Sequence, residues 1–192
     1  MFILYGLLIG LLVGFGLRGR ASGLAALDLR WSALVFLGLL VQIVLFSGPV
    51  TERVGELGPA IYVLSTAMVL AAVVRNWRIP GMPVVILGAL CNFAAITANG
   101  GYMPAGADAV TALGRSAPTV YSNSAWTPDP ALWPLTDIFA LPSWLPWSNI
   151  FSVGDVLIGG GVALVVVLAM RSRPAPVAGS ATAAASGGAP AR

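Results

Sequence analysis

The chain has 192 residues, of which 58% are hydrophobic and only 9% are charged, and its mean hydropathy is +0.90. A soluble domain carries about 25% charged residues, so this composition excludes an ordinary water-soluble protein and predicts an all-α transmembrane helix bundle with the lipid bilayer as its surroundings. The cations are all arginines that flank apolar runs instead of lining one face, so the net charge of +3 does not indicate nucleic-acid binding.

Five apolar runs each predict one membrane-spanning helix. The first run is followed by Arg18 and Arg20. A secretory signal peptide carries its positive charge before the apolar core, so this run is expected to be an uncleaved span. All five lie near the lower end of the roughly 17 to 25 residues that cross hydrocarbon. The predicted spans are residues 2–17, 31–46, 59–74, 81–98 and 152–170, which together with their loops form one domain over 1–170.

Gly6, Gly10 and Gly14 recur every four residues in the first span. Small residues on one face of a membrane helix let another helix backbone approach closely. The face is therefore a candidate contact with a membrane-protein partner. The alternative is that glycine is simply frequent in membrane helices.

The links between the runs carry signals for helix ends. Asp28 is expected to cap the second span, residues 47–58 to form a loop, and Asn99-Gly100-Gly101 to end the fourth span. Residues 99–151 are expected to form a long loop, because half of the chain's 14 prolines fall there, and the loop is expected to be ordered, because it has four tryptophans to bury. The segment 171–192 is mostly small residues and proline, which predicts a disordered tail.

The arginines are distributed unevenly between the links. Most lie in the 18–30 link, the 75–80 link and the tail, whereas the 47–58 loop and the 99–151 loop hold one each. Short loops rich in arginine stay cytoplasmic. We therefore expect the N-terminus and the long loop outside the cell and the C-terminus in the cytoplasm.

Several short motifs surround the predicted loop. They are Gly16-Leu-Arg-Gly-Arg20, Leu27-Asp-Leu-Arg-Trp31, Asn92, Asn99-Gly-Gly-Tyr-Met-Pro104, Asp137-Ile138 and Asn149-Ile-Phe-Ser-Val-Gly-Asp-Val-Leu-Ile158. In these residues the chain resembles a bacterial multi-span membrane family known as domain of unknown function 5317. The resemblance implies a bacterial inner-membrane location and supports the predicted architecture. It implies no activity.

Polar side chains inside the apolar runs are few, and all fall toward the outer side. They are Gln42, Ser65, Thr66, Asn92, Thr97 and Asp155. Polar groups inside a membrane are costly and suggest function, so this asymmetry predicts a polar pocket beneath the long loop. The alternative is that they hydrogen-bond neighbouring helices, for about 1 kcal/mol or less each. The candidate ligand-binding residues are Asn92, Asn99, Arg115, Asp137, Asn149 and Asp155.

Asp155 and the loop tryptophans each have two interpretations. Ser152-Val-Gly-Asp155 has the pattern of a capping box at the start of the fifth helix, which competes with a role of Asp155 in binding a substrate or a proton. Trp126, Trp133, Trp144 and Trp147 are typical of membrane-interface anchors. They could instead line a groove for a lipid, glycan or isoprenoid whose phosphate meets Arg115.

The residue types exclude several chemistries. Histidine is absent, Cys91 is the single cysteine, and there is no glycine-rich phosphate loop, so no metal site, cofactor or serine triad is expected. An acid pair of Asp137 with Asp155 is formally possible, which leaves an enzyme as the minority hypothesis. The leading hypothesis is a non-enzymatic binding module or a subunit of an envelope complex. The alternative is a small permease or ion-coupled carrier that uses Asp155 and Asn92.

Overall fold

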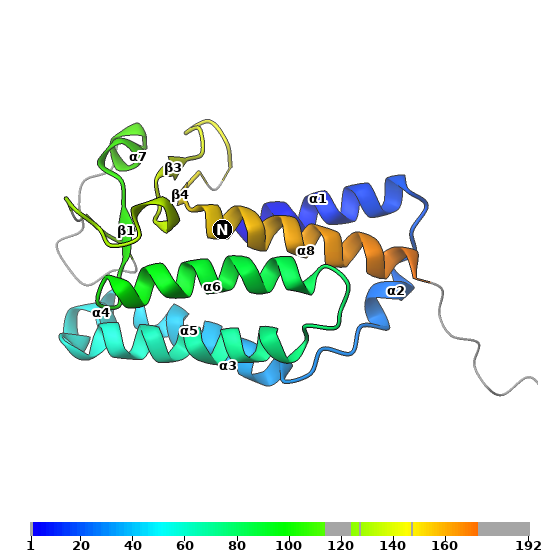
Figure 1. Ribbon diagram of the computed structural model, residues 1–192, viewed down its shortest axis with the longest axis horizontal. Helices are drawn as coiled ribbons and strands as arrows, with labels where there is room; N and C mark the ends of the chain where they lie inside the picture. Colours follow the sequence, from blue (N-terminus) through cyan, green and yellow to red (C-terminus); the bar gives the residue numbers. More distant parts are fainter. Residues whose placement is uncertain (1, 114–123, 127, 147, 173–192) are drawn as a thin grey trace, which may run out of the picture.

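The computed structural model describes residues 2–113, 124–126, 128–146 and 148–172. Five long helices run side by side along the molecule (Figure 1). Each coincides within a few residues with one of the predicted apolar runs, so the prediction of a mainly helical domain is confirmed. The long helices are α1 (Phe2–Gly16), α3 (Ser32–Leu45), α5 (Leu57–Arg75), α6 (Met82–Ala98) and α8 (Val153–Arg171).

The helices differ in whether they could cross a membrane alone. Helices α5 and α8 are long and apolar enough to do so. Helix α3 and the short helix α4 (Gly48–Val54) pass the same test together, although they are bent by 81° relative to each other. Helices α1 and α6 are apolar but shorter. By length and composition, therefore, two helices qualify as membrane spans, and the bent pair of α3 and α4 counts as a third if it forms one span.

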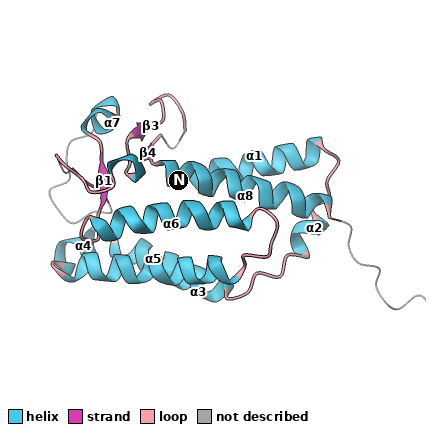
Figure 2. Cartoon of the chain, viewed as in Figure 1, coloured by secondary structure: helices cyan, strands magenta, loops and turns pink. Residues whose placement is uncertain are grey.

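Short elements gather at the two ends of the bundle, and the strands lie at the end where α6 stops and α8 starts (Figure 2). Strand β1 pairs in parallel with β2, and β3 pairs antiparallel with β4. The described residues of the segment 99–151, here called the long loop, are thus folded against the bundle. The short elements are α2 (Ser22–Ala25), β1 (Met103–Ala105), α7 (Ala107–Ala112), β2 (Ser124–Trp126), η1 (Trp133–Leu135), β3 (Phe139–Ala140) and β4 (Ile150–Phe151).

Two predictions about the links are wrong. The segment 47–58 contains α4, which begins with a proline in its first turn, a position where proline's missing N–H costs nothing. Asp28 does not cap α3, because the N-cap position is taken by Trp31 in a left-handed conformation, without a side-chain hydrogen bond. The start of α3 is held by Asn76 instead. Its side-chain amide donates to the Arg30 carbonyl over 2.8 Å and accepts from the Arg30 N–H over 2.9 Å.

The interfaces between α8 and its neighbours are built from small residues. A Cβ atom at Gly6 would lie 2.2 Å from the Gly159 carbonyl oxygen, and one at Gly10 would lie 2.9 Å from the Cα of Ala163. The close backbone approach that the glycine spacing predicts is therefore present. It is made by α8 of the same chain, so the glycine face is filled within the molecule.

Large apolar side chains point away from these interfaces. Phe36 and Ile43 of α3 are 73% and 70% exposed, and Leu64 of α5 is 65% exposed. The interior holds small residues such as Ala72 and Ala95, which are fully buried. Exposed large apolar side chains on the outside of the helices, with small residues where helices pack closely, are the distribution expected of a membrane bundle.

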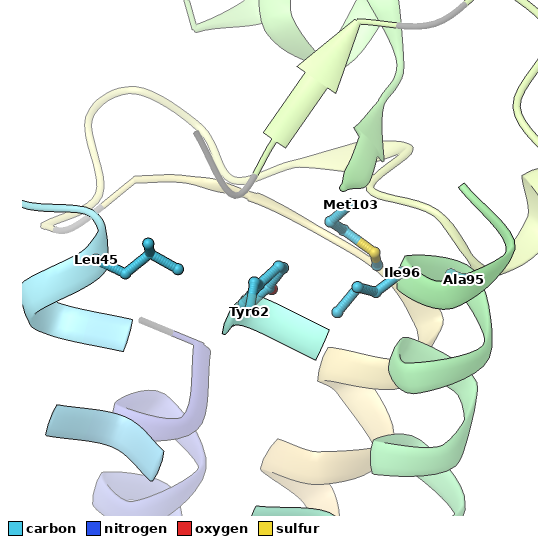
Figure 3. Packing of buried hydrophobic residues seen from close by; sticks show 5 residues of the cluster. All are labelled: Leu45, Tyr62, Ala95, Ile96 and Met103. Atoms are coloured by element: carbon cyan, nitrogen blue, oxygen red, sulfur yellow. The ribbon is translucent and has the colours of Figure 1, made fainter. Parts of the chain in front are cut away.

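A cluster of buried apolar residues joins the bundle to the start of the long loop. It comprises Leu45, Tyr62, Ala95, Ile96 and Met103, which come from α3, α5, α6 and β1 (Figure 3). The ring of Phe46 meets that of Tyr62 edge-on, with centroids 5.1 Å apart. The first strand of the long loop is therefore anchored on three helices at once.

Most of the described arginines lie at or next to the end of α1, the start of α3 and the ends of α5 and α8, and these helix ends are at the end of the bundle opposite the long loop (Figure 1). Arg75 and Arg171 end their helices, and the Arg20 N–H donates to the Met170 carbonyl over 2.7 Å. Arg53, in α4, is at the other end. Arg115 and the predicted tail beyond residue 172 lie outside the described residues.

Candidate functional site

A partly buried polar network connects the C-terminal half of α6 with the first turn of α8. The Asn92 amide donates to Asp155 Oδ1 over 2.9 Å, and Ser152 Oγ donates to Asn92 Oδ1 over 2.9 Å. Ser152 and Asp155 also exchange two 3.1 Å hydrogen bonds, from the Asp155 N–H to Ser152 Oγ and from the Ser152 N–H to Asp155 Oδ2. These two bonds form a complete capping box. The capping interpretation of Asp155 is confirmed, and Asn92 extends the box to a second helix.

Two glycines make room for this network. A Cβ atom at Gly154 would lie 1.8 Å from Asn92 Oδ1, and a Cβ atom at Gly88 would lie 2.5 Å from the Gly154 carbonyl oxygen. The side chain of Asn92 thus occupies the space that any other residue at position 154 would fill. The close crossing of α6 and α8 and the polar contact depend on the same pair of glycines.

Asp137 lies in the long loop between η1 and β3. Its N–H donates to the Pro104 carbonyl over 2.9 Å, and its own carbonyl accepts from the Gly106 N–H over 2.9 Å. The side chain is 7% exposed, and Oδ1 is buried without a hydrogen-bond partner. Such an orphaned oxygen is costly, because burial removes water and supplies nothing in exchange.

Burial and a neighbouring carboxylate both act on Asp137. Desolvation, the larger cause, and the negative charge of Asp155 raise the pKa of Asp137 from 3.8 to about 7, against a smaller opposing effect of the positively charged amino terminus. Strands β3 and β4 bring the two segments toward each other, since β3 begins two residues after Asp137 and β4 ends two residues before α8 begins.

Asn99 attaches the long loop to the end of α6. Its side-chain amide donates to the Ala131 carbonyl and accepts from the Ala131 N–H, both over 2.9 Å. The predicted helix stop is confirmed, because the Gly101 N–H donates to the Ile96 carbonyl over 2.9 Å, a Schellman-type end, with positive φ at Gly100 and Gly101. Asn99 therefore holds the loop in place.

The six candidate binding residues fall into three groups. Asn92 and Asp155 are hydrogen-bonded to each other, and the negative charge of Asp155 acts on Asp137. Asn99 and Asn149 stabilise the loop, since the Asn149 carbonyl accepts from the Leu141 N–H over 2.9 Å beside the β3–β4 pair. Arg115 lies outside the described residues. Among the polar residues of the long helices, Gln42 donates to Thr66 on the neighbouring helix and the Thr97 hydroxyl donates to its own helix, as expected if these side chains only bond helices.

Ser152 is a site residue that sequence reasoning took only as a helix cap. It is fully buried and forms the bridge between Asp155 and Asn92. The sequence shows its capping position but not the distant asparagine to which its hydroxyl donates. Within the described part of the chain, no three Cys, Asp or Glu side chains are grouped closely enough to hold a metal ion.

Neither a curated protein nor a solved structure matches this chain. A family model described as a family of unknown function, DUF5317, matches residues 26–167. This range includes α3, α5 and α6, the whole long loop and most of α8, and so contains every residue of the polar network. The chain belongs to the DUF5317 family.

Proposed function

We propose that the protein is a multi-pass protein of the bacterial inner membrane, with five spans, the N-terminus and the long loop outside, and the C-terminus in the cytoplasm. Five apolar helices whose large side chains face outward support this arrangement. The described arginines concentrate at the end opposite the long loop, as the cytoplasmic end requires. The shorter helices α1 and α6 would be matched by local thinning of the bilayer, at a modest cost.

Within that membrane we propose a non-enzymatic binding module that acts as a subunit of an envelope complex. The observation that supports this role is a long loop held on the bundle by specific bonds above a buried polar site. Asn99 fixes one part of the loop, and the Tyr5 hydroxyl donates to the Pro146 carbonyl in another. On this loop, Trp144 is 79% exposed and Trp133 is 56% exposed. Exposed tryptophans on an ordered support are suited to contact a partner protein at the membrane surface.

A small ion-coupled carrier is the second candidate. The buried Asp137 beside Asp155 favours it, because carriers place ionisable residues on the path of the coupling ion. Five short helices without a duplicated half argue against a carrier that acts alone. The two candidates differ in whether a second protein is always present.

Photo-crosslinking in living cells separates the candidates. A photoreactive residue at Trp144 is expected to give one recurring adduct with a different protein, whereas the same residue at Phe36, exposed on α3, is expected to give none. Adducts are identified by mass spectrometry after affinity purification. The subunit hypothesis is contradicted if neither photoreactive residue gives an adduct and the protein stays a monomer. The carrier hypothesis is supported if, in addition, vesicles that contain the purified protein take up solute in a pH-dependent way.

A further inference from the structure

The buried oxygen of Asp137 needs an occupant that the hydrogen bonds in the structure do not supply. Oδ1 has no hydrogen-bond partner, and the negative charge of Asp155, in the first turn of α8, acts on the carboxyl group. A buried carboxylate that feels the charge of a second carboxylate is stabilised by a cation or by a proton. The remaining question is which of these the site accommodates.

Helix α8 decides in favour of a proton. The backbone N–H groups of its first turn carry a partial positive charge, so this end of the helix favours a net negative charge and disfavours a metal cation. A single proton shared by two carboxyl groups leaves a net charge of minus one. Both oxygens of Asp155 already accept hydrogen bonds, from Asn92 and from Ser152, but each retains a second lone pair. A protonated Asp137 could therefore donate to Asp155 while those bonds remain.

We propose that Asp137 and Asp155 form a proton-binding site that holds one shared proton and so joins the long loop to α8. This inference rests on the proposed outward-facing site and names its ligand. The proton comes from the extracytoplasmic side, where the long loop lies in the proposed topology. Its release leaves two negative charges that repel each other and weakens the attachment of the loop.

Few other charged groups lie on the described elements around Asp137. Of the elements that surround Asp137, β1, η1, β3 and β4 have no acidic or basic side chain, and α6 has only the thiol of Cys91. Helix α7, which packs against β3, carries Asp108, which is exposed. The amino terminus is the positive charge that acts on Asp137. The pKa near 7 therefore belongs to Asp137, and Asp155 is the neighbouring negative charge that helps to raise it.

The proposal predicts how stability depends on pH. Because folding raises the pKa of Asp137 from 3.8 to about 7, the folded protein keeps a proton that the unfolded chain releases. The stability that this proton contributes is fully present below about pH 4, declines as the pH rises, and is lost above about pH 7. The difference corresponds to a roughly thousand-fold change in the unfolding equilibrium constant.

Infrared spectroscopy of the purified full chain in detergent micelles tests the site directly. The wild-type protein is expected to show the carbonyl band of a protonated carboxylic acid at pH 6 and to lose it with a midpoint near pH 7. Asp137→Asn should remove the band and flatten the pH dependence of unfolding, whereas Asp108→Asn, at an exposed position, should change neither. If Asp137→Asn does not fold, Asp155→Asn provides the second test, because the loss of the neighbouring charge should move the midpoint to lower pH.

Three results would overturn the proposal. The first is the absence of the carboxylic-acid band from the wild-type protein at pH 6, and the second is the persistence of the band in Asp137→Asn. The third is a pH midpoint of the band that falls when sodium chloride replaces choline chloride, because this shift would identify a metal cation as the occupant of the site. These measurements use isolated protein and need no partner. A failed crosslinking experiment would therefore contradict the proposed function without affecting the proton site. A failed infrared experiment would contradict the proton site without affecting the proposed function.

Discussion

Replacing Gly154 with alanine is expected to lower the free energy of unfolding by about 3 kcal/mol or more. Overpacking a close interface costs about 1–3 kcal/mol, and each hydrogen bond that Asn92 loses adds about 1 kcal/mol. The new Cβ atom would lie 1.8 Å from Asn92 Oδ1 and 2.8 Å from the Gly88 carbonyl oxygen. Asn92 would have to leave its bonds to Ser152 and Asp155, and α6 would have to move away from α8. The midpoint of unfolding by sodium dodecyl sulfate, followed by circular dichroism, measures the effect.

Gly160→Ala is the matched control for this change. It makes the same substitution in the same helix, at a position where a Cβ atom meets nothing within 4 Å. Alanine there should stabilise the protein by up to about 1 kcal/mol through helix propensity. Equal midpoints for the two variants would show that α6 and α8 do not cross at Gly154.

Gly101→Ala is expected to produce the second large loss. Gly101 has a φ of +88°, and a Cβ atom would lie 2.8 Å from Pro59 Cα and 2.9 Å from the Pro59 carbonyl oxygen. The left-handed backbone costs a non-glycine residue about 1–2 kcal/mol, and the clash with rigid backbone adds about 1–3 kcal/mol. The start of the long loop should therefore detach from α5, which is detected as lower stability and faster proteolytic cleavage of the loop.

Gly100→Ala separates the two causes. Gly100 also has a positive φ, of +69°, but a Cβ atom there meets nothing within 4 Å. This variant should show only the backbone cost of about 1–2 kcal/mol. If Gly100→Ala is as damaging as Gly101→Ala, the loop does not rest on Pro59 as the structure has it.

The helices were predictable because their signals are local. Runs of apolar residues define α1, α3, α5, α6 and α8, since hydropathy along the chain needs no knowledge of tertiary contacts. The end of α6 at Asn99-Gly100-Gly101 and the capping box at the start of α8 were predictable for the same reason. Each is a pattern within four residues whose geometry follows from backbone chemistry.

The remaining features depend on contacts between distant residues. Asn92 and Asp155 are 63 positions apart, so no spacing indicated that they touch. The glycine face of α1 predicted close packing but could not identify α8 as the helix that fills it. Trp31 takes the position expected for Asp28 because Asn76, at the end of α5, holds the Arg30 backbone. The strands of the long loop have only two or three residues each, too few to show an alternating pattern.

Cysteine labelling of intact cells tests the five-span topology most directly. In a Cys91→Ser background, single cysteines replace Ala26, Glu56, Arg78 and Ser143, which are exposed residues in four successive links between the long helices. A maleimide that cannot cross the membrane should label the cysteines at positions 56 and 143 in intact cells, and those at 26 and 78 only after permeabilisation. If α5 and α8 alone cross the bilayer, positions 26 and 56 will instead react alike and positions 78 and 143 will react alike, which would contradict five spans.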